Sequence, residues 1–263
     1  MSDVITGRAS EFGHWYSRTG ESVYQIRAAA GHFRPVTLRD ARKLGLVPGF
    51  SSIAKMEYKP ALERWKVDQA YLAALTLPSV RGESLEQFKE RAYQDAQAQA
   101  SKARDRGTHL HAALQGHFEG QPIASDDVPY VLPVLDWLDT RFSGPQLWSA
   151  EKSFAHPAGY GGKADLISPR AVIDFKFKDF STATIDKVRG YDEHEMQLHA
   201  YEYGFGMVHA TKLNLFISST VPGLIVPVEW QDNPDSLEAF MCLLRLWQLR
   251  KQYNSAFGAR QAA

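Results

Sequence analysis

The chain has 263 residues, and its 30 Lys and Arg balance 30 Asp and Glu, so its formal net charge is zero. This length suffices for one large domain or two small ones, and an apolar fraction of 44% excludes a disordered chain. The single cysteine, Cys242, excludes a disulfide framework, an all-cysteine zinc site and a four-thiolate iron–sulfur cluster. Taken alone, the neutral balance argues against a nucleic-acid partner, which usually leaves a basic footprint.

The net charge of zero is an average over two different halves of the chain. Residues 1–110 hold 17 Lys and Arg against 12 Asp and Glu, whereas residues 111–263 hold 13 against 18. No stretch approaches the roughly 20 apolar residues that span a bilayer, and residues 1–10 lack the apolar segment of a secretory signal. We therefore expect a cytoplasmic protein of bacterial or phage origin, with a mitochondrial location as the alternative, and no membrane partner.

The pattern predicts a mainly helical N-terminal extension over residues 1–104 and a core domain over residues 105–263. The first fifty residues show no clear periodicity. A helix is predicted over 52–75, bent near Pro60, and a long helix over 83–118 with Gly107 as its weak point. The later elements alternate in a way that is typical of an α/β fold, with one central sheet flanked by helices. We expect helices at 130–141, 191–205 and from 233 onward, and strands at 147–154, 163–167, 171–176, 213–218 and 224–230.

The segment GGKADLISPRAVIDFKFK, residues 161–178, carries the most informative residues. Side chains alternate along a strand, so Asp174 and Lys176 point to one face and Phe175 to the other. If two strands pair around the turn at 168–170, Asp165 lies near Asp174, and two converging carboxylates are unfavourable unless a cation lies between them. Mg²⁺ or Mn²⁺ suits such oxygen ligands, and a lysine nearby can contact a phosphate oxygen or orient water. This set of groups suits phosphodiester hydrolysis.

The ordered set Asp165…Asp174-Phe175-Lys176 resembles the motif of the PD-(D/E)XK nuclease superfamily, although Ala164 stands where many members have proline. Three flanking motifs resemble the RecB-like exonuclease branch, which includes the mitochondrial genome-maintenance exonuclease and phage exonucleases. They are GTHLHAAL with His111, SAEKSF with Glu151, and QLHAY with Gln197 and Tyr201. The segment FSSIAKMEYKPALERW, residues 50–65, is similar to an upstream element of that branch.

The resemblance implies a restriction-endonuclease-like α/β core with a central mixed β-sheet flanked by helices. It also implies a metal-dependent DNA exonuclease in replication, recombination or repair. It implies that Asp165, Asp174 and the backbone carbonyl of Phe175 hold the metal, that His111 completes or supports the site, and that Glu151 is a further candidate ligand. Lys176 would position the nucleophile or stabilise the transition state. Gln197 and Tyr201, one helical turn apart, would brace the site or contact the DNA strand. The missing cysteines exclude an iron–sulfur cluster, and the N-terminal extension would form part of the DNA channel.

Basic residues near these motifs are candidates for phosphate contacts, and they include Lys178, Arg104 and Arg106. His194 and His199 are five residues apart, where a helical zinc motif needs four, so we expect them to contact solvent or phosphate and not a zinc ion. No helicase-type phosphate loop is present, so unwinding would need a helicase or another replication or recombination protein as a partner.

Two alternatives to an exonuclease remain open. A structure-specific or site-specific endonuclease would use the same fold and the same residues. A non-cleaving nucleic-acid-binding subunit would keep the fold alone, and the intact set of Asp165, Asp174 and Lys176 argues against it. Preference for single-stranded DNA is a further expectation of the exonuclease interpretation.

Overall fold

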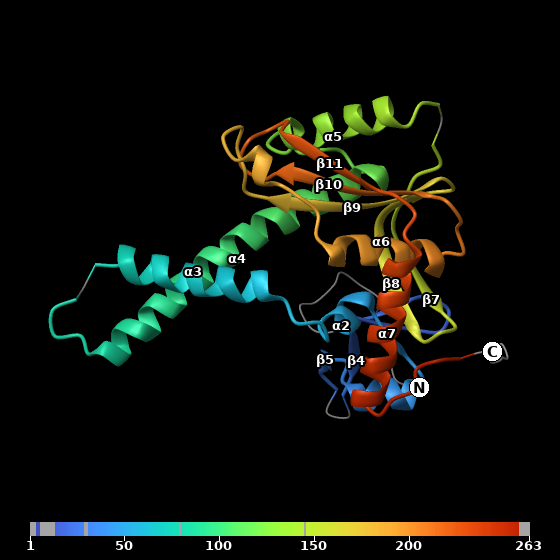
Figure 1. Ribbon diagram of the computed structural model, residues 1–263, viewed down its shortest axis with the longest axis horizontal. Helices are drawn as coiled ribbons and strands as arrows, with labels where there is room; N and C mark the ends of the chain where they lie inside the picture. Colours follow the sequence, from blue (N-terminus) through green and yellow to red (C-terminus); the bar gives the residue numbers. More distant parts are fainter. Residues whose placement is uncertain (1–3, 6–13, 29–30, 79, 145, 258–263) are drawn as a thin grey trace.

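The computed structural model describes residues 4–5, 14–28, 31–78, 80–144 and 146–257. Its centre is a five-stranded sheet with the order β11-β10-β9-β8-β7 (Figure 1). β9 and β10 are parallel and all other neighbours are antiparallel, so the sheet is mixed, as the sequence predicts. The strands are β7 (Ser149–His156), β8 (Tyr160–Ser168), β9 (Ala171–Lys178), β10 (Thr211–Ser218) and β11 (Ile225–Trp230).

Helices cover both faces of this sheet, and each face has its own hydrophobic cluster. On one face α5 and the C-terminal half of α4 pack against apolar side chains of β9 and β10, such as Ile173 and Leu215. On the other face α6 and α7 pack against β8 and β9 through residues such as Val172 and Phe240. A short 3₁₀ helix, η1 (Ile185–Lys187), precedes α6. The helix bounds are α4 (Leu85–Phe118), α5 (Val128–Arg141), α6 (Asp192–Gly204) and α7 (Pro234–Arg250).

The N-terminal part of the chain joins the same core and forms small sheets that the sequence pattern did not predict. Two three-stranded sheets have the orders β1-β4-β5 and β3-β2-β6. Trp15 packs edge-on against Trp247, and Phe50 stacks on Phe240 with ring centroids 5.2 Å apart. The bounds are β1 (Val4–Ile5), β2 (Trp15–Tyr16), β3 (Ser22–Val23), β4 (Gln25–Arg27), β5 (Phe33–Pro35), α1 (Leu38–Leu44), β6 (Val47–Pro48) and α2 (Phe50–Ala54).

The single bent helix expected over residues 52–75 is wrong, because the chain forms two separate helices there. α2 ends at Ala54, and α3 (Pro60–Thr76) begins at Pro60. Proline lacks an N–H and fits the first turn of a helix, so it starts α3 and does not bend a longer helix. α3 and the N-terminal half of α4 form a helical hairpin that projects from the body, called the arm below (Figure 1).

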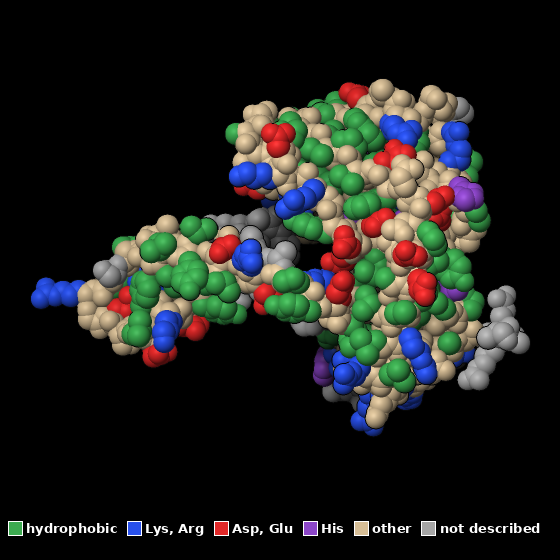
Figure 2. Space-filling model, viewed as in Figure 1, with side chains coloured by type: hydrophobic (Ala, Val, Ile, Leu, Met, Phe, Trp, Pro, Cys, Tyr) green, Lys and Arg blue, Asp and Glu red, His purple; other side chains and the backbone are tan. Residues whose placement is uncertain are grey.

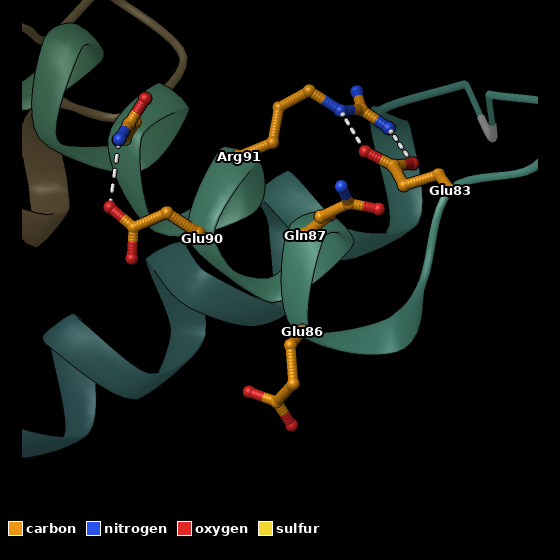
Figure 3. A pocket seen from close by; sticks show the side chains of 6 residues that line it. Glu83, Glu86, Gln87, Glu90 and Arg91 are labelled. Carbon is orange, nitrogen blue, oxygen red and sulfur yellow. Dashed lines mark hydrogen bonds and ion pairs between the residues drawn. The ribbon is translucent and has the colours of Figure 1, made fainter.

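α4 is a continuous helix across the predicted boundary at residues 104/105. A capping box fixes its start: the backbone N–H of Gln87 donates to the hydroxyl of Ser84, and the backbone N–H of Ser84 donates to the side-chain oxygen of Gln87. Near this end of the arm a shallow depression is lined by six polar side chains, and Arg91 pairs with Glu83 at 2.7 Å (Figure 3). Its acidic lining makes it unsuitable for a phosphate. Those six are Glu83, Glu86, Gln87, Glu90, Arg91 and Gln94.

No helix among the described residues is long and apolar enough to cross a membrane.

A buried lysine fixes one end of the central sheet. The side chain of Lys212, at the start of β10, is 1% exposed, and its ammonium donates to Glu202 on α6 at 3.0 Å and to Asp232 at 2.6 Å. A third hydrogen bond goes to the carbonyl of Ala210 at 3.1 Å. A buried charge with three partners is tolerated, whereas removing one member of such a group leaves an uncompensated charge.

The variant Lys212→Ala is expected to lower the free energy of unfolding by about 3 kcal/mol, because Glu202 would remain buried without its cation. Urea unfolding followed by circular dichroism measures this change. The exposed Lys152 on β7 gives the matched variant Lys152→Ala, which should lie within about 0.5 kcal/mol of wild type. A loss below about 1 kcal/mol for Lys212→Ala would contradict the prediction.

Candidate metal and phosphodiester site

The site begins where the ladder between β8 and β9 ends. The paired residues run from Ser168–Ala171 through Leu166–Ile173. The next residues along β8 and β9 are Asp165 and Asp174. Here the N–H of Phe175 donates at 2.7 Å to the carboxylate Oδ2 of Asp165. This side-chain oxygen takes the place of a backbone carbonyl of β8 as the acceptor, and the two strands diverge. This places the carboxylates of Asp165 and Asp174 at the point of divergence, as the hairpin predicted from the sequence requires.

Three side chains from three elements meet beside this opening. One potential ligand atom from each of His111, Glu151 and Asp165 lies within 4.8 Å of the others. His111 Nε2 lies 3.2 Å from Asp165 Oδ1. Imidazole and carboxylate ligands are a donor set that binds Mn²⁺ and, through the oxygens, Mg²⁺. The residues therefore fit a divalent metal.

α4 can bring His111 to the sheet because a glycine lies one turn before it. A Cβ atom on Gly107 would lie 3.3 Å from Cβ of Phe177, so glycine lets the helix approach β9 closely. The ring of His111 then lies edge-on to Phe175 and Phe177, with centroids 6.4 and 6.5 Å away. Gly107, which the sequence suggested as a weak point of the helix, is thus the position of closest approach.

Glu151 reaches the group through an unusual backbone conformation. Its φ of 53° lies in the left-handed region, which is unfavourable for a residue other than glycine. The neighbouring pairs Ala150–Leu166 and Lys152–Ala164 keep β7 and β8 in register on either side. Strain of this kind collects at functional sites, where the surrounding structure enforces it. In the structure the carboxylate of Glu151 forms an ion pair with Lys163.

Asp174 belongs to a second group of contacts beside the first. Lys176 Nζ lies 2.8 Å from its Oδ1 and 2.7 Å from its Oδ2. Gln197 on α6 donates to Oδ1 at 3.0 Å, and Asn214 on β10 donates to Oδ2 at 2.8 Å. Lys176 and Gln197, both predicted as site residues, therefore contact the carboxylate of Asp174. Asp174 itself is not part of the group formed by His111, Glu151 and Asp165.

Asn214 is a site residue that the sequence reasoning missed. It is fully buried in β10, which is parallel to β9 and aligns Asn214 with Asp174. The available signal was one polar residue in the apolar run LNLFI, residues 213–217. That signal becomes specific only when the register between β9 and β10 is known.

The pKa values of the four central groups depend on one another. Burial raises the pKa of Asp174, and the charge of Asp165 adds to this effect. Burial would also raise the pKa of Asp165, but His111, Lys176 and the N–H of Phe175 together hold it below its usual value. Burial opposes the charged forms of Lys176 and His111, yet the two carboxylates raise the pKa of both. Lys176 is therefore a cation at neutral pH.

Two further predicted site residues, Tyr201 and Lys178, lie in different surroundings. Tyr201 is buried one helical turn from Gln197, and burial together with the nearby Asp174 raises the pKa of its hydroxyl. Lys178 lies over the rings of Tyr191 and Phe216 at 5.1 and 4.6 Å.

The two arginines expected to contact phosphate both lie on α4. Arg106 lies 4.8 Å above the ring of Tyr130 and donates to the carbonyl of Ser219 at 3.4 Å. Arg104 also lies on α4, but its side chain falls outside the described part of the structure.

The histidines of α6 have roles in packing and not in zinc binding. His199 is buried, and its two ring nitrogens contact the carbonyl of Glu195 and the N–H of Asn233, each at 3.0 Å. The expected solvent or phosphate contact of His199 is therefore wrong. Burial and the charges of Lys176 and Lys178 lower the pKa of His194 to about 3, so its ring is neutral.

The variants Glu151→Gln and Asp165→Asn are expected to bind Mn²⁺ about 10- to 100-fold more weakly, because each replaces a charged ligand oxygen. The amide oxygen in Asp165→Asn can still accept from Phe175, so the strand opening is retained. Isothermal titration of the purified proteins with MnCl₂ measures the affinity. The control Asp136→Asn, an exposed position on α5, should match wild type. Unchanged binding by both site variants would refute this ligand set.

Protons should compete with the metal at His111. The metal-free protein holds the pKa of His111 above its usual value of about 6.5, and only the neutral ring binds a metal. The apparent Mn²⁺ affinity is therefore expected to fall as the pH is lowered through that raised pKa, by up to about tenfold per pH unit below it. Titrations between pH 6 and pH 8.5 test this, and His111→Ala should flatten the dependence. An equally steep profile in His111→Ala would contradict the assignment.

Comparisons with known proteins give structural neighbours only. No family model and no curated protein sequence matches the chain. An alkaline exonuclease from Laribacter hongkongensis aligns with 12% identity over 72% of this chain and 92% of its own, with a TM-score of 0.40. The same exonuclease in complex with dAMP aligns with 13% identity over 81% and 90%, with a TM-score of 0.43.

A third neighbour, a protein named SSO0001, aligns with 16% identity over 71% of this chain and 87% of its own, with a TM-score of 0.32. The sheet itself confirms the predicted α/β class, with a mixed central sheet flanked by helices.

Proposed function

We propose that the protein is a metal-dependent deoxyribonuclease that hydrolyses phosphodiester bonds from DNA ends. The observation that supports this most directly is the pair of adjoining groups at the strand opening. His111, Glu151 and Asp165 supply ligands for a divalent cation, and Asp174 and Lys176 lie beside them. A site that holds a metal next to a buried ammonium suits an anionic substrate that is attacked by water.

Each residue has a defined task in this proposal. His111, Asp165 and Glu151 would hold Mg²⁺ or Mn²⁺, with Asp174 and the backbone carbonyl of Phe175 as further candidate ligands. A bound metal supplies Lewis acidity toward the phosphate and lowers the pKa of water. Lys176, which is charged, would stabilise negative charge on the phosphate or orient the attacking water. Gln197 orients Asp174 by its hydrogen bond at 3.0 Å.

The charge distribution agrees with a localised DNA channel. Acidic side chains gather over α6, whose first turn carries Asp192, Glu193 and Glu195 (Figure 2). The basic surplus instead lies in residues 1–110. Lys163 pairs with Glu151, and Lys178 is close enough to Lys176 to feel its charge. Metal binding would neutralise the carboxylates and attract phosphate. The proposed path of the DNA therefore runs between the N-terminal extension and the strand opening, with single strands as the favoured substrate.

A nuclease of this kind needs another protein to supply its substrate. A nuclease that acts on DNA ends and carries no phosphate loop for unwinding depends on a helicase or another source of exposed ends. We therefore place it in replication, recombination or repair of DNA, in partnership with such a protein.

The variants Asp174→Ala and Lys176→Ala are expected to lower the rate of DNA cleavage by at least about 100-fold while the fold is retained. The reason is the loss of a carboxylate or of the only ammonium recorded on Asp174 among the described residues. End-labelled single- and double-stranded DNA, incubated with Mg²⁺ or Mn²⁺ and analysed on gels, reports the rate. The exposed Lys187 gives the control Lys187→Ala, which should cleave like wild type. Wild-type rates in either site variant would reject the assignment.

A circular substrate separates the exonuclease from an endonuclease on the same fold. We expect linear strands to be degraded progressively and covalently closed circles to stay intact. Cleavage of the circles would establish an endonuclease instead. Metal-dependent DNA binding without cleavage of any substrate would establish a binding subunit. Blocking the 5′ or the 3′ end of the linear strands determines the direction of digestion in the same assay.

A further inference from the structure

A buried hydrogen-bond chain reaches Asp174 from the edge of the sheet. The indole Nε1 of Trp230 donates to Oδ1 of Asn214 at 2.7 Å, and Nδ2 of Asn214 donates to Oδ2 of Asp174 at 2.8 Å. Asn214 pairs with Val228 across β10 and β11, so Trp230 is its diagonal neighbour, within reach of a long aromatic side chain. The indole thus connects the edge strand β11 to the site through one amide.

The indole of Trp230 and the carboxylate of Asp174 together fix the orientation of the Asn214 amide between them. An indole N–H can only donate, and an ionised carboxylate can only accept. Asn214 therefore satisfies both neighbours in a single orientation, with its oxygen toward Trp230 and its nitrogen toward Asp174. Without the indole N–H, the oxygen of Asn214 loses its donor, and the amide is held only by its own hydrogen bond to Asp174. Trp230 accordingly fixes the position from which Asn214 donates to this carboxylate.

Trp230 also holds the segment that leads into α6. A Cβ atom on Gly190 would lie 2.3 Å from Cζ2 of Trp230, so the indole packs directly against the backbone at Gly190. This glycine lies two residues before α6, the helix that carries Gln197. Gln197 is the second amide on Asp174. One aromatic ring therefore supports both amides that orient this carboxylate.

We propose that Trp230 and Asn214 are positioning residues that set the orientation of Asp174 and thereby the affinity of the site for its divalent cation. This inference rests on the proposed function, because it assigns to Asp174 a part in holding the metal. Residues that hydrogen-bond to metal ligands commonly change metal affinity by 10- to 100-fold when they are replaced. Neither side chain is expected to contact DNA, so both act through Asp174.

The test is a double-mutant cycle on Mn²⁺ affinity, measured by isothermal titration without DNA. Trp230→Phe keeps an aromatic ring and removes the N–H, whereas Asn214→Leu keeps the approximate volume and removes both hydrogen bonds. Each single variant is expected to bind Mn²⁺ about tenfold more weakly. The double variant should be no weaker than Asn214→Leu, because the N–H that Trp230→Phe removes acts only through the amide of Asn214. Trp148→Phe, at a tryptophan packed against Phe142 in the other hydrophobic cluster, is the control and should bind like wild type.

Cleavage assays provide the second measurement. At limiting Mn²⁺ the cleavage rate of Trp230→Phe should fall about tenfold, and excess Mn²⁺ should restore it, since the defect lies in metal affinity. A change in packing alone would lower the melting temperature without such rescue. Wild-type Mn²⁺ affinity in Trp230→Phe, or additive losses in the double variant, would overturn the inference while leaving the nuclease proposal intact. A wild-type protein that neither binds Mn²⁺ nor cleaves DNA would instead refute the proposed function.

Discussion

The site depends on one carboxylate taking the place of a strand carbonyl. The ladder between β8 and β9 continues for three pairs and then meets Asp165, whose side chain accepts the N–H of Phe175 at 2.7 Å. Because buried backbone donors need an acceptor, this substitution allows the strands to separate without an unpaired N–H. β9 stays in the sheet through its parallel partner β10. The result is an interruption of the β8–β9 ladder, with Asp165 on one strand and Asp174 on the other.

Buried neighbouring carboxylates need cationic partners, and three basic side chains supply them here. Lys176 lies against Asp174, His111 against Asp165, and Lys163 against Glu151. Each carboxylate thus has a positively charged or protonatable partner within the protein, which removes much of the repulsion that two neighbouring acids would produce. In the proposed metal site these partners would compete with the bound metal. The metal affinity would then depend on pH and on single substitutions of the partners.

The sequence predicts the parts of this arrangement that follow from strand alternation and helix spacing. Asp174 and Lys176 share a face because they are two residues apart, and Gln197 and Tyr201 share a face because they are four apart. Asn214 could not be found in this way, since its role depends on the register of two strands separated by a helix. The small N-terminal sheets escaped prediction because strands of two or three residues are too short to show a period. The break before Pro60 was missed because proline inside a helical pattern marks either a kink or a start.

The continuity of α4 links two parts of the molecule that are otherwise far apart. The helix begins at the end of the arm at Leu85 and carries His111 in its last third. At a rise of 1.5 Å per residue, the 26 steps from Leu85 to His111 correspond to about 39 Å. An uninterrupted helix transmits displacement along its axis with little loss. Anything bound at the end of the arm would therefore lie at a fixed distance from the imidazole of His111. A force on the arm would displace this candidate metal ligand together with the whole helix.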